Sequence, residues 1–166
     1  MSVRSSPVTI RVANRNDAPA MIPLVNEAFT VEDFLEGTRT DAERMAKSME
    51  TGQFLVAEDS ERKIVATVYT ELHGERGYFG MLAVDPSQQG KGLGRTMIDA
   101  AEDHCRKLGC THMDIKVLSL RKGLPDYYRQ FGYIETGFEG FRPSRPFKPG
   151  VECHCIVMSK DLSRRG

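Results

Sequence analysis

The sequence lacks most of the features that assign a protein to a class at first reading. Its 166 residues contain no tryptophan and only four cysteines, and 23 basic residues balance 23 acidic ones, so the formal net charge is zero. No apolar run approaches the roughly 18 residues that a membrane span needs, and the first residues lack the apolar middle of a secretion signal. We therefore expect a cytoplasmic protein that binds neither nucleic acid nor a membrane.

The four cysteines do not suggest a metal site or a disulfide framework. No C-x-x-C pair occurs among Cys105, Cys110, Cys153 and Cys155, and all four lie in apolar contexts typical of helices and strands. His154 stands between two of them in a strand-like run, where neighbouring side chains point to opposite faces. We expect buried free thiols and no metal.

The length fits a single domain over residues 1–166, with no repeat, low-complexity segment or linker. Residues 8–13 predict a strand, and residues 16–29 predict a helix whose first two residues supply capping oxygens. A second helix follows over residues 41–52, and the connector at residues 31–40 is interpreted as a substrate lid.

The rest of the chain predicts strands around a long helix. Residues 53–58, 63–72 and 77–84 predict an antiparallel meander, because polar turns separate them. Apolar residues then recur on one helical face over residues 93–108, and Gly109 is the expected end of that helix. Further elements are expected as strands at residues 110–118, 133–137 and 153–158, a short helix at 124–131, and a proline-containing loop at 141–150.

The most informative stretch joins the meander to the long helix. It reads Gln89-Gly-Lys-Gly-Leu-Gly94 and follows an aspartate-proline pair. Glycines let the main chain approach a ligand closely, and the unpaired N–H groups at a helix start attract anions. The pattern predicts a site for a pyrophosphate.

Two other phosphate-binding patterns do not fit this spacing. A nucleotide P-loop would need glycine and serine or threonine where Asp85 and Gly92 stand. The dinucleotide fingerprint would need glycine where Arg95 or Met97 stands. A nucleotide hydrolase is therefore disfavoured.

The spacing that does fit is Q-x-x-G-x-G, and with it the sequence resembles the GNAT superfamily of N-acetyltransferases. The order of the expected elements and the later segment Tyr127-Tyr-Arg-Gln-Phe-Gly-Tyr133 extend the resemblance over most of the chain. It implies an α/β (α+β) fold with a mixed, mostly antiparallel sheet of about seven strands and about four helices. It also implies an enzyme that transfers an acetyl group from acetyl-CoA to a small-molecule amine, directly and in a ternary complex.

The resemblance assigns residues to the cofactor. Main-chain groups of residues 82–84 would hydrogen-bond the acetyl carbonyl and the pantetheine arm as an added strand does, and amides of residues 89–96 would take the pyrophosphate. Lys91 and Arg95 would either add charge at the rim or lie solvated. The cofactor-binding set comprises Leu82, Ala83, Val84, Gln89, Gly90, Lys91, Gly92, Leu93, Gly94, Arg95, Thr96, Arg121 and Tyr128.

Acetyl transfer needs a donor for the developing oxyanion and a proton for the leaving thiolate. The resemblance gives these roles to the main-chain N–H of Leu82 and to the hydroxyl of Tyr128, although a core tyrosine with a satisfied hydroxyl is the alternative. Helical spacing places Tyr128 on the face of Leu124 and Phe131 and turns Tyr127 about 100° away.

Two departures from the family pattern leave the base unassigned. Arg121 stands seven residues before Tyr128, where many relatives carry asparagine. The strand at residues 78–84 has no carboxylate where many relatives carry glutamate. The remaining candidates for the base are Glu71, His154 and Asp114.

The first helix and the connector are acidic and partly aromatic. This composition suits the binding of a cationic amine with an apolar portion, and the alternative is an acidic surface exposed to solvent. Polyamine, amino sugar, amino-acid derivative and protein N-terminus all stay open as acceptors, as does a homodimer. An alternative function is a catalytically silent acyl-CoA-binding sensor or interaction module. Candidate substrate residues are Phe29, Glu32, Phe34, Glu71 and His154.

Overall fold

The computed structural model describes residues 7–140 and 147–163. Its centre is a seven-stranded sheet in the order β1-β2-β3-β4-β5-β7-β6, in which all neighbours are antiparallel except β4 and β5. The predicted mixed, mostly antiparallel sheet is confirmed. The strands are β1 (Thr9–Val12), β2 (Gln53–Glu58), β3 (Ile64–His73), β4 (Arg76–Val84), β5 (His112–Leu118), β6 (Ile134–Gly140) and β7 (His154–Asp161).

Four α-helices cover this sheet, as predicted. Successive side chains of a strand point to opposite faces of the sheet, and each face of this sheet carries a hydrophobic cluster. In β2, Leu55 and Ala57 pack in the cluster that contains residues of α3 and α4, whereas Phe54 and Val56 pack with residues of α1 and α2. All four of these side chains are buried, so β2 is covered on both faces. The helices are α1 (Ala18–Ala28), α2 (Ala42–Thr51), α3 (Leu93–Lys107) and α4 (Leu124–Arg129).

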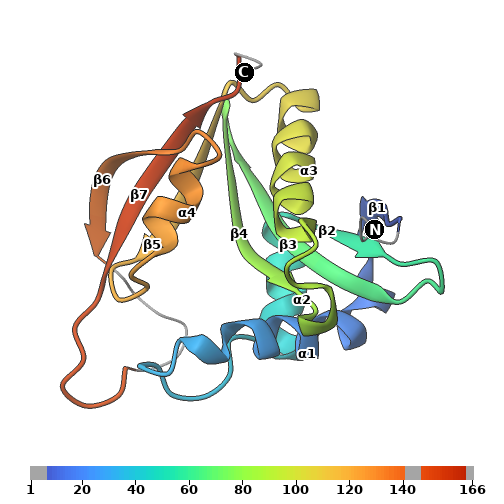
Figure 1. Cartoon of the computed structure of the whole chain (residues 1–166), viewed down its shortest axis with the longest axis horizontal. Helices are drawn as coiled ribbons and strands as arrows, with labels where there is room; N and C mark the ends of the chain where they lie inside the picture. Colours follow the sequence, from blue (N-terminus) through green and yellow to red (C-terminus); the bar gives the residue numbers. More distant parts are fainter. Residues whose placement is uncertain (1–6, 141–146, 164–166) are drawn as a thin grey trace.

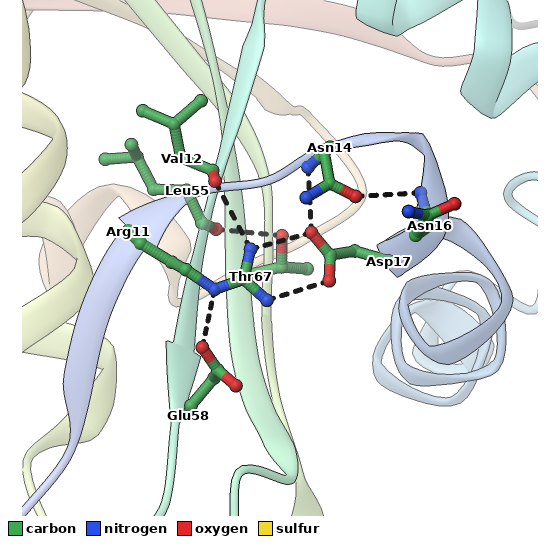
Figure 2. Close-up of polar contacts among 8 residues, drawn as sticks. All are labelled: Arg11, Val12, Asn14, Asn16, Asp17, Leu55, Glu58 and Thr67. Carbon is green, nitrogen blue, oxygen red and sulfur yellow. Dashed lines mark hydrogen bonds and ion pairs between the residues drawn. The ribbon is translucent and has the colours of Figure 1, made fainter.

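The start of the first helix differs from the prediction. A 3-10 turn, Arg15–Asp17, precedes α1, and the capping side chain is that of Asn14, which accepts a hydrogen bond from the main chain of Asn16. The carboxylate of Asp17 does not cap α1. It instead accepts two hydrogen bonds from the guanidinium of Arg11 in β1, each 2.8 Å long (Figure 2). The same carboxylate also accepts a hydrogen bond from the main-chain N–H of Asn14, so it completes a capping box at the 3-10 turn while it binds Arg11.

The parallel pair β4 and β5 is joined over only three residue pairs, from Arg76↔His112 to Tyr78↔Asp114. Beyond this ladder the two strands diverge, and the sheet opens into a V (Figure 1). Met81 in β4 has a positive φ of 49°, close to a register shift against β3 that marks a bulge. Since a bulge bends its strand, it helps to turn the end of β4 away from β5.

The predicted loop at residues 141–150 is described only from residue 147 onward, and residues 141–146 lie outside the described part of the chain. Phe147 forms an isolated bridge with Leu35 of the connector. In the ranges that the structure describes, none of the helices has the length and apolar content that a bilayer crossing demands.

Candidate active site

Two cavities lie where β4 and β5 separate. The first, which we call the strand cleft, has a volume of about 510 Å³ and is lined by residues of β4, β5, α4 and the connector. The second, the glycine-turn cavity, has a volume of about 470 Å³ and is lined by the turn before α3, the end of β4 and α4. Leu82 and Tyr127 line both cavities. The two spaces are therefore adjacent at Leu82, close to the end of β4.

The glycine-turn cavity has the features of an anion site. Gly90 and Gly92 have φ angles of +81° and +78°, which side chains rarely adopt, and a Cβ at either position would meet no atom within 4 Å. The space in front of them is therefore open. Gly92 is the N-cap of α3, and no side chain caps that helix. Its first N–H groups are thus available to a ligand.

Most of the predicted cofactor-binding residues lie at this cavity. Its lining includes Leu82, Val84, Gln89, Gly90, Gly92, Leu93, Gly94 and Arg95. Lys91 and Thr96 are exposed and do not line it, and the Thr96 hydroxyl donates to the carbonyl of Gly92. Ala83 is buried against α1 and α2, so only its main chain is available for the expected strand-like contact.

Tyr128 lines the strand cleft. Its ring packs edge-on against Phe79 and Tyr133, with centroids 6.0 and 6.1 Å away. Burial raises the pKa of Tyr128 above the ordinary value for tyrosine. The phenol therefore holds its proton at neutral pH and can only donate it.

The expectation that Tyr127 turns away from the site is wrong. Tyr127 lines both cavities, and its hydroxyl lies 3.1 Å from the position that a Cβ on Gly94 would take. The reason is that Tyr127 lies three residues after Leu124 and four before Phe131, so it shares a helical face with both, and its ring centroid lies 5.0 Å from that of Phe131.

Arg121 forms an ion pair across the mouth of the strand cleft. Its Nη1 lies 3.1 Å from Oε2 of Glu32, and the Glu32 side chain is only 6% exposed. The pair joins the connector after α1 to the turn before α4. The arginine that departs from the family pattern therefore has a partner that the sequence pattern did not reveal.

Only part of the predicted substrate set reaches the strand cleft. Phe29 and Glu32 line it, whereas Phe34 does not. Glu71 lines a separate depression beside His73. His154 is exposed against the ring of Phe138, and the next residue along β7, Cys155, lines the cleft instead.

The third candidate for the base, Asp114, is also elsewhere. Two hydrogen bonds from Arg76 and one from Ser159 hold its carboxylate, and the bond to Arg76 lowers the pKa of Asp114. Thus none of the three side chains that the sequence offered as a base lines the strand cleft. The carboxylates among its described lining residues are Glu32 and Glu139.

The cleft also contains residues that the sequence did not single out. They are Arg39, Tyr78, Lys116 and Glu139. Tyr78 could have been found from the sequence, because it begins the predicted strand at residues 78–84, which leads to the glycine turn. Lys116 and Glu139 meet only because β7 lies between their strands, and nothing local in the sequence indicates that order.

The described residues contain no group of three or more His, Cys, Asp or Glu side chains arranged to hold a metal ion. All four cysteines are free, and three are buried. Burial raises the pKa of Cys105 to about 12, so that thiol stays protonated.

The model of the acetyltransferase (GNAT) family matches residues 18–133 of the chain, which include all the described lining of the glycine-turn cavity and most of that of the strand cleft. The chain belongs to this family.

Two curated relatives are mycothiol acetyltransferases. The protein from Propionibacterium freudenreichii is 31% identical over 141 residues, covering 80% of this chain and 45% of its own length. The protein from Saccharopolyspora erythraea is 31% identical over 116 residues, covering 66% and 38%. The chain thus spans less than half the length of these relatives.

Solved structures of other GNAT proteins share the fold. The structure of yncA from Salmonella typhimurium with its cofactor acetyl-CoA superposes with a TM-score of 0.71 at 21% identity, covering 97% of each chain. The ribosomal-protein-alanine N-acetyltransferase from Brucella melitensis has a TM-score of 0.71 at 21% identity, covering 92% of this chain and 99% of its own. At such identities the likeness concerns the fold alone.

Proposed function

We propose that this GNAT protein is an acetyl-CoA-dependent N-acetyltransferase that transfers the acetyl group directly to a small-molecule amine while both substrates are bound. The observation that carries the proposal is the meeting of two cavities at Leu82 and Tyr127. One cavity has the geometry of an anion site, and the other has a buried, protonated phenol beside diverging strands. Two substrates that enter from the two cavities would meet at Leu82, close to the end of β4.

The glycine-turn cavity would hold the pyrophosphate of the coenzyme. Positive φ angles at Gly90 and Gly92 turn the main chain outward, and the dipole of α3 favours negative charge at this end. Main-chain groups at the end of β4 would bind the pantetheine arm, since β5 no longer pairs with β4 there. Acetyl-CoA supplies the activated acyl group.

The remaining steps fall to the chain's own groups and to water. The amine nitrogen forms a bond to the acyl carbon, the carbon–sulfur bond breaks, and the thiolate needs a proton. We assign the main-chain N–H of Leu82 to the developing oxyanion and the hydroxyl of Tyr128 to the thiolate. Glu32 and Glu139 are both in ion pairs, with Arg121 and Lys116 respectively, so we assign the amine proton to water in the open cleft.

The test is to incubate the protein with acetyl-CoA and a panel of amines, to follow free thiol, and to identify acetylated products by mass spectrometry. The panel includes an acceptor of the mycothiol acetyltransferase type, because the curated relatives carry that name. We expect thiol release that depends on the amine. Binding of acetyl-CoA without product from any amine is what a silent sensor would show, and it would overturn the enzymatic proposal.

A further inference from the structure

The charged residues of the strand cleft do not match an acceptor that is simply cationic. Among the described residues that line it, two are acidic and three are basic: Glu32 and Glu139, and Arg39, Lys116 and Arg121. Of the acidic side chains between the first helix and the connector, Glu27, Asp33 and Glu36 are exposed, and only Glu32 reaches the cleft. The acidity that the sequence suggested for the acceptor site therefore lies outside it.

Both acidic side chains of the cleft are matched by basic ones. Glu32 lies 3.1 Å from Arg121, and Glu139 lies 3.1 Å from Lys116. Arg39 then brings the formal charge of the described lining to +1. A guanidinium has five N–H donors, more than any one neighbour uses, so Arg39 can bind an anion in addition to its other contacts.

Arg39 is placed where an acceptor would lie. Its guanidinium carbon is 5.3 Å from the centroid of the Phe29 ring, which also lines the cleft. Its charge also reaches the Tyr78 hydroxyl on β4 and partly offsets the rise that burial causes in the pKa of Tyr78. The cation thus lies over the ring of Phe29, on the part of the cleft that the connector supplies.

We propose that the acceptor is an aminocarboxylate, a small amine with a carboxylate a few atoms away, whose carboxylate is bound by Arg39. This rests on the proposed function. The apolar part of the acceptor would lie against Phe29 and Tyr78. A planar guanidinium matches a carboxylate with two parallel hydrogen bonds, which gives orientation as well as affinity.

The same charge distribution bears on the missing base. The described lining carries one excess positive charge, and the carboxylate of a bound aminocarboxylate would cancel it at Arg39. No carboxylate among the described lining residues is then left over to hold the amine as an ammonium ion or to act as its base. The proton of the amine is therefore left to water in the cleft.

The experiment compares matched acceptors that differ only in the carboxylate. Phenylalanine, leucine and methionine are each paired with the amine left by decarboxylation and with the amide. With the wild-type protein we expect kcat/KM to be about tenfold or more higher for the aminocarboxylates, the size of one charge-assisted contact. In Arg39→Gln this preference should fall to about one, through a higher KM for the aminocarboxylate.

Lys47→Gln is the matched control, because it removes an exposed positive charge from α2 that does not line the cleft. It should keep the full preference. Equal kcat/KM within each pair would overturn the inference and leave the proposed function standing. An undiminished preference in Arg39→Gln would overturn the assignment of Arg39, and no acetylated product from any acceptor would overturn both proposals.

Discussion

At the scale of single residues, the two adjacent tyrosines of α4 should separate chemistry from cofactor binding. Tyr128→Phe removes the proposed proton donor and keeps the ring between Phe79 and Tyr133. General acid assistance is worth about 10²–10⁴-fold, so kcat should fall by at least about tenfold with little change in the KM for acetyl-CoA. Steady-state kinetics with both substrates varied measure the two parameters.

Two other tyrosines serve as controls. Tyr127→Phe removes a hydroxyl beside Gly94 and should mainly raise the KM for acetyl-CoA. Tyr69→Phe removes a hydroxyl that is hydrogen-bonded to Thr51 and lines neither cavity, so both kinetic parameters should stay at the parental values. Parental turnover in Tyr128→Phe would show that another group or water protonates the thiolate.

Asp17 gives a second prediction at this scale, through pH. The hydrogen bonds from Arg11 lower the pKa of Asp17 in the folded state (Figure 2). A carboxylate with a depressed pKa stabilises the fold above its unfolded pKa, about 3.9, and that contribution is lost as the pH falls through the folded value. The Tm of the wild type should therefore drop more steeply between neutral pH and pH 3 than the Tm of Asp17→Asn.

At neutral pH the same variant should be less stable by about 1–3 kcal/mol, since Arg11 loses a charged partner. Calorimetry or circular dichroism at a series of pH values measures both effects. Asp99→Asn, which changes an exposed carboxylate on α3, should follow the wild-type curve at every pH. Parallel curves for Asp17→Asn and the wild type would mean that the Arg11 contact does not shift the titration.

At the scale of elements, the glycine turn can be tested against a second glycine in the same helix. Gly92 and Gly109 flank α3 at opposite ends, with φ angles of +78° and +95°. Replacing either by valine forces a side chain into the left-handed region, at about 1–2 kcal/mol. Only Gly92→Val should also weaken acetyl-CoA binding, by about tenfold or more, because only Gly92 borders the proposed phosphate site.

Isothermal calorimetry with coenzyme A measures this difference, and thermal unfolding checks that the two variants lose similar stability. If Gly92→Val bound coenzyme A with full affinity, the turn would not be the phosphate site. If Gly109→Val lost affinity to the same extent, the effect would come from the stability of α3 as a whole.

The helices and strands could be predicted well from the sequence, because the spacing of apolar residues within each segment indicates its type. In α3, for example, one face carries the buried residues Leu93, Met97, Ala101 and Cys105. The glycine turn could be located for the same reason, since its spacing and the helix that follows are local. Boundaries moved by a few residues, most of all in β6 and β7.

The lining of the strand cleft could not be predicted, because it depends on pairings between distant segments. Glu32 meets Arg121 across 89 positions, and Lys116 meets Glu139 only through the insertion of β7. The sequence offered His154 as a candidate for the base, yet it lies on the exposed side of β7 while Cys155 faces inward. A shift of one residue in the register of β7 would exchange the faces of these two side chains. That register is set by the pairing of β7 with β5 and β6.

At the scale of the whole molecule, coenzyme binding should tie the two halves of the sheet together. We expect a Kd for acetyl-CoA in the micromolar range, roughly 8 kcal/mol, and much weaker binding of ATP and NAD. At a hundredfold excess over Kd the fold should gain about 2.7 kcal/mol. Main-chain amides of residues 79–84 and 115–118 should then exchange hydrogen more slowly, because a ligand lies between the strands that diverge there.

Calorimetry with the three ligands and hydrogen exchange with and without acetyl-CoA measure these effects. The amides of β2, which is buried on both faces and lies away from the cleft, report the stabilisation that the whole fold shares, and the slowing at residues 79–84 and 115–118 is measured against theirs. Affinity for ATP or NAD equal to that for acetyl-CoA would contradict the interpretation of the glycine turn.

The last strand of the sheet lies between two strands that precede it in the chain, since β7 separates β5 from β6. During synthesis, β5 and β6 are therefore made without their common neighbour, and β5 is joined to the earlier strands by three residue pairs only. A nascent chain that has not reached residues 154–161 would present two open strand edges, which favour aggregation and attract chaperones. The strand cleft, which Cys155 of β7 helps to line, would thus form only after residues 154–161 are made. A chain that stalls before that point would bind chaperones and would have no enzymatic activity.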